Sequence, residues 1–135
     1  MSYKKLRIYH LSFEVSLKVH RMSLALPAFE LYETGSQIRR SSKSVKSNIV
    51  EGYGRRKYKS EFIRYIILSQ ASNDETLDHL ETLYVTGSLK DKDTYLELRN
   101  LLIRLGKEIN SFIIALENKH NKFKSSIQYP ASRIY

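Results

Sequence analysis

Eight basic residues lie between positions 38 and 60. The chemistry that their types and spacing indicate most clearly is the binding of an anion. A single acid, Glu51, lies among them. On a helix with roughly 100° per residue, Arg39, Lys43 and Lys46 form one stripe, about a quarter-turn from an apolar stripe. Lysine and arginine neutralise phosphates and release counterions, so the segment predicts a surface that binds nucleic acid, either RNA or DNA. The expected phosphate contacts are Arg39, Arg40, Lys43, Lys46, Arg55, Arg56, Lys57 and Lys59.

The same basic residues have two other interpretations that the sequence leaves open. On a later predicted helix, Asp74, Asp78 and Glu81 align at positions i, i+4 and i+7. These acids are able to pair with the basic stripe of a neighbouring subunit, in which case the arginines hold subunits together and the protein is an assembly scaffold. The third interpretation is a basic face that is only solvated.

Aromatic residues near the cations favour the first interpretation. Tyrosine rings stack on exposed bases, and three tyrosines are interleaved with the basic residues: Tyr53, Tyr58 and Tyr65. Glu51 lies beside Gly52 at a predicted helix end, away from both stripes. We expect Glu51 to form an ion pair with Arg39 or Arg40, within the chain or across a subunit contact, rather than to act as a catalytic base.

Catalytic chemistry has few candidate residues. The chain has no cysteine, its four histidines are isolated from one another, and no segment matches the GxxxxGK[ST] phosphate-binding loop. The best metal candidates are Glu75, Asp78, His79 and Glu81. Di-metal bundles use a Glu-x-x-His pair on each of two helices, whereas Glu75 and His79 are an i, i+4 pair. We therefore predict no enzyme activity, no cofactor and no metal site, with a metal-dependent bundle enzyme as the weakest alternative.

Four amphipathic helices are expected to position these residues. Apolar residues recur every three or four positions over residues 6–26, 36–53 and 61–85, and from Asp91 or Asp93 to about 118. Short connections between such helices predict an all-α antiparallel up-down-up-down four-helix bundle over residues 1–120, followed by a polar tail over 121–135. A second apolar strip on the first helix suggests self-association and consists of Phe13, Leu17 and Leu24.

Individual residues are expected to set the helix ends. Pro27 ends the first helix because its ring clashes with the preceding turn. Gly52 and Gly54 are expected to end the second helix in a left-handed cap conformation. Ser60 is the expected N-cap of the third helix, and Asp91 or Asp93 that of the fourth.

Composition predicts a cytoplasmic protein with an anionic partner. The formal charge is +9, and residues 1–60 hold 13 basic and four acidic residues. The absence of cysteine fits a reducing compartment. The beginning of the chain has no apolar run of signal-peptide length, and no apolar run is long enough to span a bilayer, so we expect no association with a membrane.

Two segments resemble the 23S rRNA intervening-sequence protein family, a family of four-helix bundles. SQIRRSSKSVKSNIVEGYGR, residues 36–55, is similar to the family's S-Q-I-R-R-A-A-x-S-I/V-P-x-N-I-A-E-G-x-G-R signature, and EFIRYIILSQASNDETLDHLE, residues 61–81, to its next helix. The signature falls on Gln37, Arg39, Arg40, Asn48, Glu51, Gly52, Gly54, Arg55 and Glu61. Many members have proline where this chain has Lys46, so we expect no kink there and one more positive charge.

The resemblance implies a left-handed up-down bundle that assembles as a ring-like homopentamer and has no enzyme activity. Relatives include reading frames inside insertions of 23S rRNA genes. They also include the accessory protein of diversity-generating retroelements, a basic pentamer that binds a reverse transcriptase and nucleic acid. The partners that the resemblance implies are therefore further copies of the chain, nucleic acid, and a protein such as a reverse transcriptase.

Overall fold

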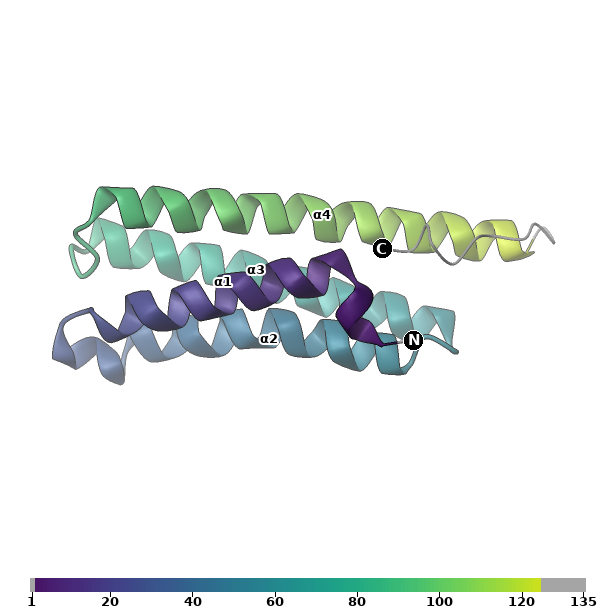
Figure 1. The fold of residues 1–135 in the computed structure, drawn as a ribbon, viewed down its shortest axis with the longest axis horizontal. Helices are drawn as coiled ribbons and strands as arrows, with labels where there is room; N and C mark the ends of the chain where they lie inside the picture. Colours follow the sequence, from purple (N-terminus) through teal and green to yellow (C-terminus); the bar gives the residue numbers. More distant parts are fainter. Residues whose placement is uncertain (1, 125–135) are drawn as a thin grey trace.

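The computed structural model describes residues 2–124, with side chains described up to Asn118, and contains four α-helices (Figure 1). There are two short 3-10 helices: η1 at Tyr3–Lys5 precedes α1, and η2 at Ala28–Leu31 lies between α1 and α2. No strand occurs within residues 2–124, so the predicted all-α four-helix bundle is confirmed. The helices are α1 at Arg7–Leu24, α2 at Thr34–Gly54, α3 at Lys59–Val85 and α4 at Lys92–Lys124.

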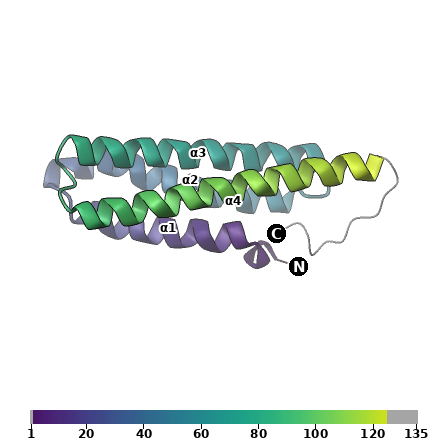
Figure 2. The same cartoon turned by 90° about the horizontal axis from the view of Figure 1, so that it is seen from above.

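Successive helices run antiparallel, and each packs against the helix before it and the helix after it, with α4 closing against α1. The contact between α2 and α3 is the most extensive, and that between α1 and α4 the least. The α2–α3 turn lies at one end of the bundle, and both views show α4 extending past the other helices at this end (Figures 1 and 2). The α1–α2 and α3–α4 connections lie at the opposite end.

The core consists of the apolar stripes that the helical spacing predicts. Each fully buried aliphatic or aromatic side chain contributes roughly 1.5–3 kcal/mol relative to an exposed one. The second strip on α1 remains on the surface, where Phe13 is 39%, Leu17 41% and Leu24 60% exposed. The largest fully buried side chains are Phe62, Ile38, Ile49, Ile66, Leu80, Leu83, Leu98, Leu102, Leu105, Ile109, Leu116 and Val15.

The prediction that Gly52 and Gly54 end α2 in a left-handed conformation is wrong. Among the described glycines only Gly87, in the α3–α4 loop, has a positive φ, of 84°. Helix α2 continues through Gly54, and its C-cap residue Arg55 has an ordinary φ of −105°. Gly52 is instead buried against α3, and the contact is so close that a Cβ at this position would lie 2.9 Å from the Cβ of Tyr65. The absence of a side chain therefore serves the close approach of two helices.

The predicted helix starts are confirmed in one case and wrong in the other. The carboxylate of Asp91 accepts hydrogen bonds from the Asp93 N–H at 3.1 Å and the Thr94 hydroxyl at 2.8 Å, so Asp91 caps α4. Helix α3 begins one residue before Ser60, with Tyr58 as its N-cap residue and no side-chain cap bond. Helix α4 continues to Lys124, beyond the predicted start of the tail, and residues 125–135 of that tail lie outside the described residues.

Hydroxyl groups occupy much of the contact between α2 and α3. The buried Ser69 hydroxyl donates to the Val45 carbonyl oxygen at 2.7 Å. Two pairs of hydroxyl oxygens cross the same contact: Thr76 with Ser41 at 2.8 Å, and Ser72 with Ser44 at 2.9 Å. Because small side chains allow backbones to approach closely, these hydrogen bonds and Gly52 together fix how α2 lies on α3 and where the turn between them emerges.

Candidate nucleic-acid interface

Arg56 is the best-positioned cation of the α2–α3 turn. Its guanidinium carbon lies 4.1 Å from the centre of the Tyr53 ring, and its Nη1 donates to the Tyr53 carbonyl oxygen at 2.9 Å. These two contacts hold the planar group in one place. No ion pair to Arg56 occurs among the described side chains, so its other N–H groups are available to an anion, and a planar guanidinium suits phosphate oxygens.

Arg55, next to Arg56, has its charge compensated within the chain. Its Nε donates to Glu51 at 3.0 Å, and its Nη1 lies 3.6 Å from Glu61. The expectation that Glu51 pairs with Arg39 or Arg40 is therefore wrong within the chain, where its partner is Arg55. The reason is helical spacing, since Glu51 and Arg55 are four residues apart and lie on one face of the end of α2.

The two lysines of the turn region differ in their exposure. Lys57 is exposed, with its Nζ 5.8 Å from the centre of the Tyr58 ring. Lys59 lies in the first turn of α3 and is partly buried, and this burial lowers the pKa of its amino group below the ordinary value for lysine. Lys57 is thus the more exposed of the two charges.

The basic stripe on α2 is divided between two surroundings. Arg39 donates to the Ser23 hydroxyl at 3.0 Å and to the Leu31 carbonyl oxygen at 2.8 Å, so it ties α2 to the end of α1 and to η2. Lys46 also faces α1, with its Nζ 4.8 Å from the centre of the Phe13 ring. Arg40 and Lys43 are exposed to solvent. The helix period predicted that these basic residues lie close together on α2, but it did not distinguish the two that contact α1 from the two that face solvent.

The three tyrosines named as stacking candidates also differ. Tyr53 is half-buried beneath Arg56, and its ring meets Phe62 edge to face. Tyr65 is half-buried beneath two guanidinium groups, those of Arg55 at 5.0 Å and Arg64 at 4.6 Å. Tyr58 is 62% exposed. Of these three rings, Tyr58 has the most surface available to a ligand.

Sequence reasoning missed additional cations at this end of the bundle. Lys4 and Lys5 are exposed in η1, which packs against both α1 and α2 (Figure 1). Arg64 in α3 is held by Glu61, and the same hydrogen bond lowers the pKa of the Glu61 carboxyl. The pair of lysines near the beginning of the chain was visible in the sequence. Only the packing of η1 brings it to the end of the bundle that holds the turn.

The remaining signature residues have structural surroundings. Asn48 donates to the Ser44 carbonyl oxygen at 3.0 Å and to the Ser44 hydroxyl at 3.1 Å, beside the hydroxyl-rich contact with α3. Gln37 is exposed on the first turns of α2. Gly54 is exposed, and a Cβ there would meet no atom of the described residues within 4 Å. Within this single chain, the segment thus combines residues that set helix contacts with residues that face solvent.

The acidic residues of α3 do not converge on a metal-binding arrangement. Within the side chains described, no group of three His, Cys, Asp or Glu residues is placed to hold a metal ion. His79 lies 3.2 Å from Glu75 along one helix face. Asp78 and Glu81 point to solvent, as does Asp74. Among the same described residues, no helix is both long enough and apolar enough to cross a membrane.

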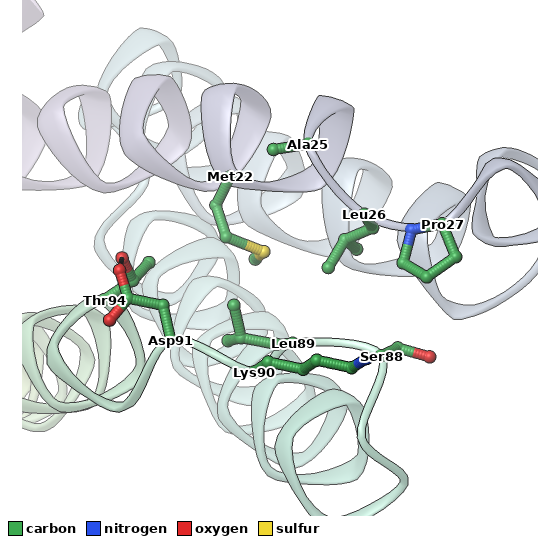
Figure 3. Close-up of a pocket in the computed structure, with 9 residues that line it drawn as sticks. All are labelled: Met22, Ala25, Leu26, Pro27, Ser88, Leu89, Lys90, Asp91 and Thr94. Atoms are coloured by element: carbon green, nitrogen blue, oxygen red, sulfur yellow. Dashed lines mark hydrogen bonds between the residues drawn. The ribbon is translucent and has the colours of Figure 1, made fainter.

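A pocket of about 530 Å³ lies at the other end of the bundle, away from the basic turn (Figure 3). Met22 from the end of α1, Leu26 from the connection between α1 and η2, and Leu89 from the α3–α4 loop form its apolar wall. The neighbouring Ser88 hydroxyl donates to the buried carboxylate of Glu30 at 2.6 Å. The full lining is Met22, Ala25, Leu26, Pro27, Ser88, Leu89, Lys90, Asp91 and Thr94.

Comparisons with known proteins agree with this architecture. The profile of the family described as 23S rRNA-intervening sequence protein matches residues 4–111. A solved structure from Bacteroides thetaiotaomicron VPI-5482, described as a protein with unknown function from the S23 ribosomal protein family, is similar with a TM-score of 0.70 and 21% identity. The similarity covers 78% of this chain and 94% of that one, and at this identity it establishes the fold alone. No curated protein matches the sequence.

Proposed function

The chain belongs to the 23S rRNA-intervening sequence protein family, and we propose that it is a non-enzymatic, cytoplasmic homopentamer that binds nucleic acid, preferentially RNA, through the α2–α3 turn. The observation that carries this proposal is the guanidinium of Arg56, which is held against Tyr53 while the side chain remains exposed to solvent. Lys57 adds an exposed charge beside it. The family's name, which refers to insertions in 23S rRNA, is consistent with RNA as the partner.

Pre-organisation of Arg56 favours binding over a merely solvated cation. A free arginine loses side-chain freedom when it contacts phosphate, and a guanidinium already fixed by a ring and a carbonyl loses less. Arg55 contributes less net charge, because Glu51 and Glu61 already neutralise it. We therefore assign the principal phosphate contacts to Arg56 and Lys57, with Arg40 and Lys43 as a secondary exposed pair on α2.

The test compares two double variants that lose the same charge at opposite ends of the bundle. Arg56→Ala with Lys57→Ala removes the proposed contacts, and Lys90→Ala with Lys92→Ala removes two exposed lysines from the α3–α4 end. Affinity for a short structured RNA is measured against salt concentration. Loss of two phosphate contacts should make the negative slope of log K against log salt shallower by about 1.4 to 1.8, because each contact contributes about 0.7 on a single strand and about 0.9 on a B-form DNA duplex.

The control variant sets the criterion for the proposal. Removal of Lys90 and Lys92 lowers the overall charge by the same amount, but these lysines lie away from the proposed site. The salt slope should therefore differ from that of the parent protein by less than the loss of about half of one phosphate contact would cause. Equal losses in the two double variants would mean that binding follows net charge alone and that the turn is not the site. Absence of binding by the parent protein at low salt would reject the nucleic-acid proposal itself.

A second candidate function, assembly into a scaffold for a protein partner, is favoured by two complementary faces. The first face combines exposed Phe13 and Leu17 on α1 with two lysines of the adjacent α2, the exposed Lys43 and the half-buried Lys46 beside Phe13. The second combines exposed Ile67 on α3 with Asp74 and Asp78. Because α1 and α3 are diagonal in the bundle, the two faces point in different directions, and repeated contacts between unlike faces build a ring when the rotation closes.

Charge exchange between the two faces tests this assembly. Asp74→Lys with Asp78→Lys places like charges at the contact and should lower the particle mass, measured by light scattering, from about five times 15.8 kDa toward that of one chain. Adding Lys43→Glu and Lys46→Glu should restore it. If the assembly forms normally with the reversed acids, these two faces do not meet. A ring that shows no binding to RNA at low salt would favour the protein scaffold over the nucleic-acid function.

A further inference from the structure

Tyr58 is an exposed aromatic ring at the tip of the basic turn, and neither the phosphate contacts nor the assembly uses it. We propose that Tyr58 is the stacking platform for an unpaired nucleobase, so that the interface selects single-stranded or looped nucleic acid over a continuous duplex. This inference rests on the proposed nucleic-acid function, and it adds the class of substrate and the residue that determines it.

The backbone of Tyr58 is fixed although its ring is exposed. Its N–H donates to the Arg55 carbonyl oxygen at 2.9 Å, and its own carbonyl oxygen accepts from the Phe62 N–H at 3.0 Å. Tyr58 is also the N-cap residue of α3, so the start of the helix fixes the position of the Cα atom that carries the ring. An exposed ring on a fixed backbone offers a flat surface whose position is largely set before a ligand arrives, which lowers the entropic cost of stacking.

The neighbouring tyrosines show why this ring differs from the others in the cluster. Guanidinium groups already cover Tyr53 and Tyr65, whereas Tyr58 is 62% exposed. Among the described side chains, the one cation placed over the Tyr58 ring is the exposed Lys57, at 5.8 Å. A lysine at that distance on a flexible stem is easily displaced by a base, and it can then contact the phosphate that follows the base.

The geometry discriminates between unpaired and paired nucleic acid. In a duplex the faces of each base are covered by the bases above and below it, so a single ring on a turn has nothing to stack on. An unpaired base in a strand, loop or bulge has an open face, and aromatic stacking is the usual way in which proteins hold it. The flanking cations contact the backbone of either form, so they supply affinity, and Tyr58 supplies the preference.

The experiment measures affinity for three ligands of one sequence with the full-length protein. These are an unstructured RNA of about 12 nucleotides, the DNA strand of the same sequence, and the RNA annealed to its complement. Tyr58→Ala should weaken binding of the single strands by about 5- to 150-fold, the range expected for loss of one stacked base, and change duplex binding by less than about twofold. The DNA strand shows whether the platform requires the ribose, since stacking on the base alone affects both strands equally.

Three further variants separate stacking from structure. Tyr58→Phe retains the ring and should bind single strands within about twofold of the parent, whereas Tyr58→Leu retains apolar bulk without a π-face and should behave as the alanine variant. Tyr32→Ala removes an 84% exposed tyrosine at the opposite end of the bundle and should have no effect. Single-strand affinity that is unchanged in Tyr58→Ala, or duplex affinity that falls equally, would overturn the inference.

The two proposals fail in different ways. If Arg56→Ala with Lys57→Ala abolishes binding while Tyr58→Ala and Tyr58→Leu retain the parent's preference for single strands, the turn binds nucleic acid and Tyr58 is not the platform. If the parent protein binds none of the three ligands at low salt, the nucleic-acid function fails before Tyr58 is tested.

Discussion

Substitution of Gly52 by alanine tests whether close contact between α2 and α3 determines the geometry of this end of the bundle. A Cβ at Gly52 would lie 2.9 Å from the Cβ of Tyr65 and 3.4 Å from both the Phe62 Cδ1 and the Phe62 carbonyl oxygen. The nearest of these atoms is attached directly to the backbone of α3, so no change of rotamer removes it. The helices must separate by a few tenths of an ångström, or bend, to accept one methyl group.

Two opposing terms determine the expected change in stability. Over-packing of a well-packed contact costs about 1–3 kcal/mol. Alanine gains up to about 1 kcal/mol over glycine in a helix interior, because it loses less backbone freedom on folding. With the clash at the rigid part of a side chain, we expect a net loss of about 1–2 kcal/mol for Gly52→Ala. For a chain of this length that loss corresponds to a decrease of about 3–8 °C in melting temperature.

Gly54→Ala is the matched control, two residues away on the same helix. Within the part of the chain that the structure describes, a Cβ at Gly54 meets no atom within 4 Å, so this variant should be as stable as the parent or slightly more stable. Urea unfolding followed by circular dichroism, at one protein concentration because assembly also stabilises the folded chain, compares the three proteins. If Gly52→Ala is at least as stable as Gly54→Ala, the close contact with Tyr65 does not constrain α2.

Two other substitutions test local features of the fold. Arg39→Ala removes hydrogen bonds to Ser23 and the Leu31 carbonyl oxygen, and it should lower the free energy of unfolding by about 1–2 kcal/mol. Arg40 is exposed, so Arg40→Ala should change the free energy of unfolding by less than about 0.5 kcal/mol. Equal effects of the two variants in urea unfolding would contradict this distinction. The hydrogen bond from the Thr94 hydroxyl, followed by that from the Asp93 N–H, lowers the pKa of Asp91 below its ordinary value of 3.8. A carboxyl whose pKa is depressed in the folded state adds stability above its unfolded pKa, and this stability is lost as the pH falls through the folded pKa. The difference in unfolding free energy between the parent and Asp91→Asn should therefore be constant near neutral pH and shrink below about pH 4. A difference that is independent of pH down to about pH 2 would refute the cap.

The helical period was sufficient to predict the core, because burial on a helix repeats with the same period. Residues such as Ile38, Val45 and Ile49 in α2 are separated by the spacings that place them on one face, and all three are fully buried. Helix ends were harder to predict, because several local signals compete there. Asp91 followed its intrinsic preference for an N-cap, whereas Ser60 was displaced by a helix that begins one residue earlier.

The partners of the charged residues were not predictable from spacing alone. The period placed Arg39 and Lys43 in one stripe, yet Arg39 lies against the end of α1 and Lys43 faces solvent. The difference depends on which parts of α1 and η2 lie beside each residue, a property of the packed bundle. Glu51 shows the opposite case, since the nearest available cation at i+4, Arg55, was visible in the sequence and became its partner.

The segment EGYGR, residues 51–55, joins helix packing to the proposed binding surface. Gly52 brings the end of α2 close to α3, and the intervening Tyr53 then lies between Phe62 in the core and the guanidinium of Arg56 on the surface. The position of Arg56 therefore depends on the same contact that excludes a side chain at residue 52. Gly52→Ala should consequently weaken RNA binding as well as stability, although residue 52 is buried and touches no ligand, and Gly54→Ala should do neither. Loss of stability in Gly52→Ala with fully retained affinity would show that the turn holds Arg56 and Tyr58 in place without help from the α2–α3 contact.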